Sequence, residues 1–146
     1  MNEEYQKQLN QIEKQQDDSK LQYFLDTSNL EEEFNENSKT IKEEIEVNKQ
    51  KIHAFNEFVP KAIDEIEQLQ HKVGESNYQY STEKINDLYQ DNIKKFNANI
   101  EKLEQKLFNI TKEFEDNYEQ TTSTHYKFMN KLDDLIYELQ DKFNSN

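Results

Sequence analysis

Residues 41–73 of the chain read IKEEIEVNKQKIHAFNEFVPKAIDEIEQLQHKV, and the spacing of the apolar residues in this stretch decides the fold. The apolar positions recur at alternating steps of three and four residues: Ile41, Ile45, Ile52, Phe55, Val59, Ala62, Ile66, Leu69 and Val73. This spacing is typical of a helix that packs along a coiled-coil seam. We therefore expect the stretch to be helical and to pair with another helix.

The same pattern extends in both directions along the chain. Towards the N-terminus it continues through Phe34, Leu30, Tyr23, Ile12, Leu9 and Tyr5, with polar residues filling the seam at Gln16, Ser38 and Asn48. The second half repeats it through Tyr89, Ile93, Phe96, Ile100, Leu103, Leu107, Ile110, Phe114, Tyr118, Thr121, His125, Phe128, Leu132, Leu135 and Leu139. Two successive steps of four, from Ile110 to Tyr118, form a stutter, at which a supercoil is locally unwound.

The only glycine of the chain, Gly74, divides the two halves. Glycine can close a helix in the left-handed conformation, and Ser76 with Gln79 has the form of a capping box that opens the next helix. We therefore predict an all-α fold: a long antiparallel helical hairpin, or two-helix coiled coil, that forms a single domain over residues 1–146. Helix one should span about residues 3–73, the turn 74–77 and helix two about 77–144. Facing residues should then have numbers that add up to about 150.

Two segments are expected to weaken the first helix. Pro60 lies within the seam and removes a backbone donor, so a kink is expected there. Residues 26–29, Asp-Thr-Ser-Asn, are poor helix formers, and Ser28 with Glu31 resembles a second capping box. A break in the helix is therefore expected at 26–29, facing the equally weak segment 121–124, and amide hydrogens in both segments should exchange early.

Composition excludes several kinds of partner. The chain has a net charge of -13, a pI of about 4.7 and no arginine, which argues against binding to nucleic acid or anionic lipid. It has no run of roughly 20 apolar residues, so membrane insertion is not expected. The sequence from Met1 to Tyr5 is polar and acidic, unlike a cleavable signal peptide. We expect a cytoplasmic protein, or one secreted without such a signal.

No catalytic or metal-binding pattern is found in the sequence. A rod of two helices offers no concave pocket, and one glycine cannot build a phosphate-binding loop. The three histidines, His53, His71 and His125, lack the spacing of a helical zinc site, and His125 falls on the seam. We therefore expect no enzymatic activity, no cofactor and no metal.

The chain contains nine phenylalanines and eight tyrosines, and several of them fall beside the seam. These are Phe24, Phe58, Tyr78, Tyr80, Phe108 and Tyr126. Two interpretations remain open: they cover the edges of the seam, or they form a second apolar face for a partner helix or a second copy of the chain.

The architecture resembles the small helical proteins of type VII secretion, which comprise the WXG-motif family and the longer helical partners of LXG-domain toxins. Lys72-Val73-Gly74 stands where the WXG family has Trp-x-Gly, and the chain has no tryptophan. The family's export signal resembles Tyr-x-x-x-Asp/Glu late in the second helix, and Tyr137 with Asp141 matches it.

This resemblance implies a targeting or chaperone-like partner that pairs with the helical N-terminal domain of a secreted LXG toxin, with or without a second small helical protein, and assists its export. Tyr137 and Asp141 would be the export motif, and the residues expected to contact the partner are Phe24, Phe128, Leu132, Leu135 and Leu139. The alternative is a structural spacer protein that uses the same seam to associate with itself.

Overall fold

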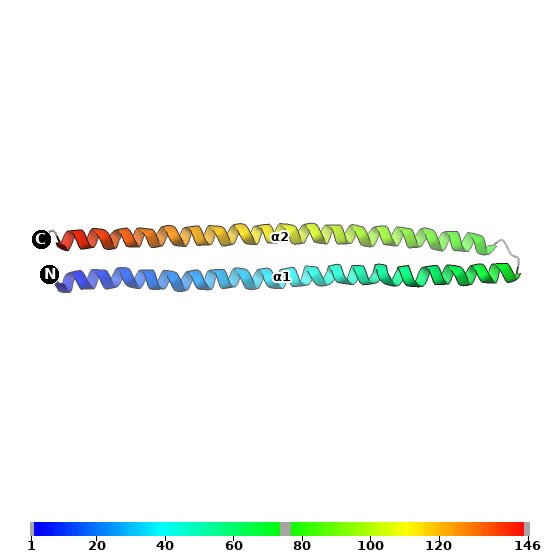
Figure 1. Ribbon diagram of the computed structural model, residues 1–146, viewed down its shortest axis with the longest axis horizontal. Helices are drawn as coiled ribbons and strands as arrows, with labels where there is room; N and C mark the ends of the chain where they lie inside the picture. The colour runs from blue at the N-terminus through cyan, green and yellow to red at the C-terminus, as the bar shows by residue number, and fades with distance from the viewer. Residues whose placement is uncertain (1, 74–76, 145–146) are drawn as a thin grey trace. The chain divides into compact units, whose positions relative to one another are not determined.

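The computed structural model describes the backbone of residues 2–73 and 77–144 and the side chains of residues 3–72 and 82–144. It contains two α-helices, α1 (Asn2–Val73) and α2 (Asn77–Asn144), which pack against each other and confirm the predicted all-α helical hairpin (Figure 1). The helix ends agree with the expected limits at residues 73 and 77. Gly74 and the Ser76–Gln79 capping box lie outside the described residues or side chains.

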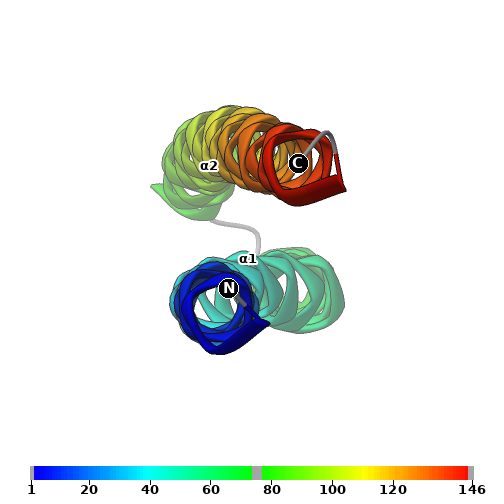
Figure 2. The same cartoon turned by 90° about the vertical axis from the view of Figure 1, so that its left-hand side faces the viewer.

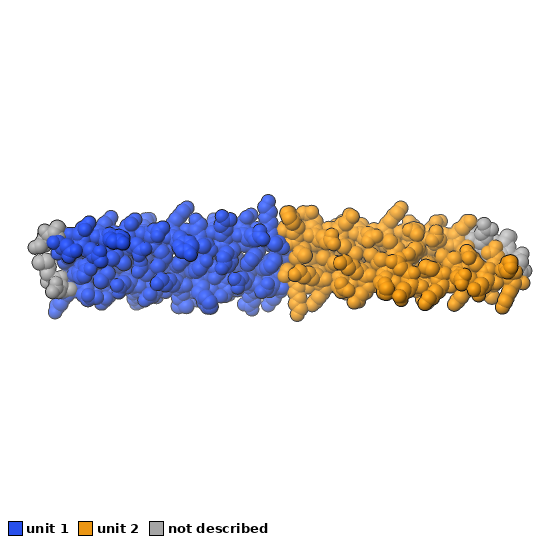
Figure 3. Space-filling view, in the orientation of Figure 1, with its two compact units in different colours: residues 1–36, 110–146 blue, residues 37–109 orange. Residues whose placement is uncertain are grey.

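The chain divides into two compact units (Figure 3). Each unit is a pair of antiparallel helix segments. Of the described residues, unit 1 joins 2–36 of α1 with 110–144 of α2, and unit 2 joins 37–73 of α1 with 77–109 of α2. The segments of a unit lie side by side in both views of the ribbon (Figures 1 and 2). The expectation that the whole chain forms one domain stays a prediction.

The register of the pairing follows from ring contacts between the helices. In unit 1, Tyr5 meets Phe143 edge-on at 5.4 Å between ring centroids, Tyr23 stacks on His125 at 4.4 Å, and Phe34 stacks on Phe114 at 4.6 Å. In unit 2, Phe55 lies 5.7 Å from Phe96. The residue numbers add up to 148 in the first three pairs and 151 in the fourth, which confirms the expected value of about 150.

Each unit has a thin core, in keeping with the 32% of hydrophobic residues in the chain, against roughly 45–50% in an ordinary globular domain. The apolar side chains that are buried among those described lie on the seam: Ile41, Ile45, Val59, Ile100, Leu132 and Leu139. Burying such a side chain completely stabilises a fold by roughly 1.5–3 kcal/mol, so a helix pair with few of them depends on each one.

The predicted break of α1 at residues 26–29 is wrong, because the helix continues through them. Thr27 is buried in the seam, and its hydroxyl donates to the carbonyl oxygens of Tyr23 at 2.9 Å and Phe24 at 3.2 Å. Packing and these bonds outweigh the low helix propensity of the segment. The helix also continues through Pro60, so the proline does not end it, and the expected kink there stays a prediction.

The seam of unit 1 departs from a strict heptad on both helices. On α1, buried or half-buried positions follow steps of four, four, three and four through Ser19, Tyr23, Thr27, Leu30 and Phe34. On α2 the same steps run through Ile110, Phe114, Tyr118, Thr121, His125, Met129 and Leu132. The predicted stutter at Ile110–Tyr118 is therefore one of a series that repeats every eleven residues. Eleven residues close three turns at 3.67 residues per turn, which is near the geometry of an unstrained helix.

Candidate functional site

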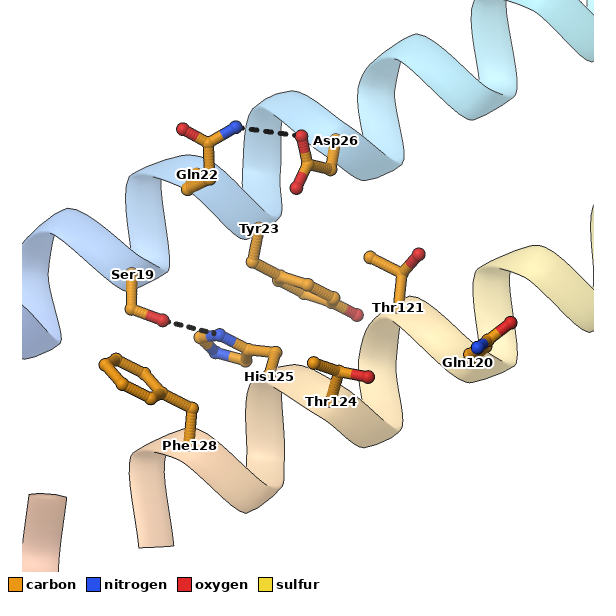
Figure 4. A pocket seen from close by; sticks show the side chains of 9 residues that line it. All are labelled: Ser19, Gln22, Tyr23, Asp26, Gln120, Thr121, Thr124, His125 and Phe128. Atoms are coloured by element: carbon orange, nitrogen blue, oxygen red, sulfur yellow. Dashed lines mark hydrogen bonds between the residues drawn. The ribbon is translucent and has the colours of Figure 1, made fainter. Parts of the chain in front are cut away.

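A polar and aromatic layer crosses the seam of unit 1, and we call it the polar layer: Gln16, Ser19, Tyr23, Thr122, His125 and Asp133. At its centre the rings of Tyr23 and His125 are nearly parallel, at an interplanar angle of 12°. Ser19 Oγ lies 3.1 Å from His125 Nδ1 (Figure 4). Tyr23 Oη lies 2.8 Å from Thr122 Oγ1. Each helix thus supplies polar groups that form hydrogen bonds with the other helix.

The polar layer continues towards the chain ends. Gln16 Nε2 donates to the carboxylate of Asp133 at 2.8 Å, again across the helix pair. Among the described residues, no buried side-chain nitrogen or oxygen lacks a hydrogen-bond partner. Polar groups that are hydrogen-bonded across a helical seam determine which helices pair and in which register, at some cost in stability. The polar layer therefore specifies this alignment of α1 and α2.

A groove opens on one side of the polar layer, and we call it the histidine groove. It has a volume of about 440 Å³ and is lined by Ser19, Gln22, Tyr23, Asp26, Gln120, Thr121, Thr124, His125 and Phe128. Figure 4 shows the rings of Tyr23, His125 and Phe128 between the two helices. The Gln22 amide donates to the Asp26 carboxylate at 2.9 Å along α1. The groove thus combines aromatic surface with polar walls.

A second groove, which we call the glutamate groove, is also lined by residues of both helices of unit 1. It has a volume of about 470 Å³ and is lined by Glu31, Phe114, Glu115, Tyr118, Glu119 and Thr122. A hydrogen bond with the Tyr23 side chain and the charge that this phenol would carry raise the pKa of Tyr118 above its ordinary value of 10.0, with smaller contributions from burial and the Glu31 carboxylate. Tyr118 therefore links the polar layer to this groove.

The hydrogen bond between the Tyr23 and Tyr118 side chains gives a first prediction. Tyr23→Phe keeps the ring but removes the hydroxyl, so the pKa of Tyr118 should fall towards 10.0. A raised pKa in the folded state means that folding favours the neutral phenol of Tyr118. The stability that this preference contributes is present below pH 10 and is lost as the pH rises through the raised pKa. Carbon NMR of labelled tyrosine rings should show the shift, whereas Tyr137→Phe should leave the Tyr118 titration unchanged. An unchanged Tyr118 pKa in Tyr23→Phe would contradict the hydrogen bond between these two side chains.

The residues expected to contact a partner fall into two groups. Leu132 is 3% exposed and Leu139 is also buried, both in the helix pair of unit 1, so neither is available to a partner while that pair is formed. Phe128 and Leu135, expected on the seam, are 44% and 43% exposed, and that expectation is wrong. Phe24 is 64% exposed, as expected for a residue beside the seam.

The seam reaches Leu132 by a different path from the expected one. After His125 it passes through half-buried Met129 and then Leu132, and after Leu132 it passes through half-buried Ile136 to Leu139. The step of four from His125 to Met129 turns Phe128 out of the interface, and the step to Ile136 does the same for Leu135. Leu69 in unit 2 is likewise 49% exposed, because half-buried Gln70 follows Ile66 on the seam.

Tyr137 and Asp141 lie one helical turn apart on α2 and are both exposed, Tyr137 by 67%. Neither side chain is used by the helix pair for its core. The pair is therefore accessible to another molecule, which is a necessary property of a recognition motif.

The other side chains beside the seam, Phe58, Phe108 and Tyr126, are also exposed, whereas the side chains of Tyr78 and Tyr80 lie outside the described ones. Within residues 2–73 and 77–144, no three His, Asp or Glu side chains are grouped as a metal site would need. No helix in the same ranges is long and apolar enough to cross a membrane.

Sequence reasoning placed Tyr23 and His125 on the seam but did not identify the polar layer. The signal was available in the register, since numbers that add up to about 150 bring Ser19 and Tyr23 opposite residues 125–131. What the register could not give is the rotation of each helix, which decides that Ser19 reaches His125.

No protein-family model matches the chain, and neither a curated protein nor a solved structure matches it. The geometry and the chemistry of the described residues are therefore the basis on which a function is inferred.

Proposed function

We propose that this chain is a non-enzymatic protein that binds a helix of another protein along unit 1. The resemblance to type VII secretion proteins suggests the helical N-terminal domain of a secreted LXG toxin as the partner. In this proposal the chain meets the toxin in the cytoplasm, covers its apolar surface and assists its export.

The observation that carries the proposal is the exposure of Phe128 and Leu135. These two side chains lie seven residues apart, so they project from the same side of α2 two turns apart. Phe128 also lines the histidine groove. An apolar pair at this spacing beside a groove between two helices is the form of surface that takes up an amphipathic helix.

A third helix laid along this side would cover apolar area that the helix pair leaves exposed. Each Å² removed from water contributes roughly 25 cal/mol before the cost of ordering the partner. The aromatic side chain of Phe128 is suited to act as an anchor, because buried aromatic residues supply much of the binding energy of interfaces. Tyr137 and Asp141 lie outside the seam, so the proposal leaves them free to act as an export signal on the complex.

The second candidate is a structural spacer that associates with itself. The same two exposed side chains would then pack against a second copy. The proposal favours a different protein as partner, since two chains with a net charge of -13 each repel one another.

The mass of the purified protein in solution separates the two candidates. Light scattering after size-exclusion chromatography should give the 17.7 kDa of one chain when it is alone, and a stable 1:1 or larger hetero-complex when it is co-expressed with the toxin-like product of the neighbouring gene. Phe128→Ala should weaken that complex roughly tenfold or more, as expected for an interface anchor. A tight homodimer that ignores the neighbouring product would overturn the proposal.

A further inference from the structure

The glutamate groove combines a floor of uncharged side chains with acidic walls. Phe114, Tyr118 and Thr122 of α2 follow one another at steps of four, and Phe114 packs both on Phe34 and on Tyr118. Glu31 lines the groove from α1, and Glu115 and Glu119 line it from α2. Three carboxylates from two helices therefore surround one apolar and aromatic surface.

These carboxylates are not neutralised within the helix pair. Among the described residues, none of Glu31, Glu115 and Glu119 forms an ion pair, although Lys112 lies three residues before Glu115. Glu115 and Glu119 are one turn apart on the same helix, an arrangement in which like charges repel and destabilise the helix. The groove thus has a concentrated negative charge that no ion pair within the described part of the helix pair neutralises.

We propose that the glutamate groove binds lysine or arginine side chains of a basic amphipathic helix on the partner protein. The inference rests on the proposed function and adds the chemistry of the partner. The long aliphatic stems of these cations pack on apolar and aromatic surface while their charged heads reach carboxylates. The shape and charge of the groove, with aromatic rings as its floor and glutamates as its walls, match both parts of such a side chain.

Charge also identifies the occupant. A second copy of this chain would bring its own excess of 31 acidic over 18 basic residues to an already acidic groove. An anionic membrane surface would be repelled in the same way. A partner helix with basic residues on one face is the occupant whose charge complements the groove, and charge complementarity sets both specificity and the rate of association.

The test uses a fluorescein-labelled 18-residue helical peptide with leucines on one face and lysines on the other, and its binding to the whole chain is measured by fluorescence anisotropy. The variant Glu31→Gln/Glu115→Gln/Glu119→Gln should bind this peptide roughly tenfold more weakly and with a flatter salt dependence. The matched control, Glu43→Gln/Glu44→Gln/Glu46→Gln in unit 2, removes the same charge from exposed positions and should change binding less than about twofold. The same peptide with glutamate in place of lysine should not bind.

Equal loss of binding in the two triple variants would overturn the inference, because binding would then follow the overall charge. A wild-type homodimer that becomes tighter in the Glu31, Glu115 and Glu119 variant would also overturn it, since the groove would then face a second copy. Circular dichroism should show the same helicity in both variants. If the neighbouring gene product forms a complex that is insensitive to this variant and to salt, the inference fails while the proposed function stands.

Discussion

Leu132→Asp should unfold the helix pair of unit 1, whereas Leu135→Asp should leave it folded. Leu132 is 3% exposed, so aspartate at this position loses the packing of the leucine and places a carboxylate without a partner in the seam. The expected cost is about 3–5 kcal/mol, which is most of the stability of a small helical unit. Leu135 is 43% exposed, and a charge there can remain in water at a cost below about 1 kcal/mol.

Hydrogen exchange measured by NMR distinguishes these outcomes residue by residue. In Leu132→Asp, protection should be lost in residues 5–30 of α1 and 115–140 of α2 together, because these segments stabilise each other. In Leu135→Asp, protection should match that of the unchanged chain, while binding of the partner proposed above should weaken. Equal loss of protection in the two variants would show that Leu135 belongs to the core and that the described seam is wrong.

Tyr137→Ala should reduce export of the bound toxin roughly tenfold while leaving the helix pair and toxin binding intact. Tyr137 is exposed and contributes little to the core, so its removal should affect only the binding of a molecule that recognises the surface of the complex. Truncation of an aromatic anchor in an interface commonly costs 2 kcal/mol or more, which exceeds the roughly 1.4 kcal/mol that a tenfold loss requires. Asp141→Ala should have a similar effect if the two residues act as one motif. Secretion of the toxin into the medium is the measurement.

Tyr126 offers a matched control for this experiment. It is exposed to a similar extent, lies eleven residues before Tyr137 on the same helix, and is followed at the fourth position by Asn130 instead of an acidic residue. Tyr126→Ala should therefore leave export unchanged. Equal export by the Tyr137, Asp141 and Tyr126 variants would mean that Tyr137 and Asp141 are an ordinary surface pair.

The sequence was sufficient for the helices and their pairing. A chain with one glycine placed between two periodic halves has few ways to turn. The end of α1 at Val73, the start of α2 at Asn77 and the register of their pairing could therefore be predicted. The expected break at 26–29 is wrong because helix propensity describes an isolated helix, whereas Thr27 is buried in the seam and its hydroxyl is hydrogen-bonded.

The candidate site was only partly predictable for a related reason. A seven-residue repeat continued from His125 predicts a seam through Phe128 and Leu135. Apolar residues also occur at Met129 and Ile136, so the sequence is compatible with either seam. The choice depends on how much the helices supercoil, which local spacing does not determine. The grooves could not be predicted, because they depend on which flanking side chains leave space between two helices.

The stacks of Tyr23 on His125 and Phe34 on Phe114 are eleven residues apart on both helices, and this spacing limits how unit 1 can change in length. A deletion between Tyr23 and Phe34 on α1 alone moves Tyr23 past His125 and breaks the cross-helix bonds of the polar layer. A deletion of eleven residues from α1 together with the eleven that face them on α2 removes three turns from each helix and returns the remaining layers to the same alignment. The helix pair can therefore be shortened or lengthened only in matched blocks of three helical turns, one block on α1 and one on α2.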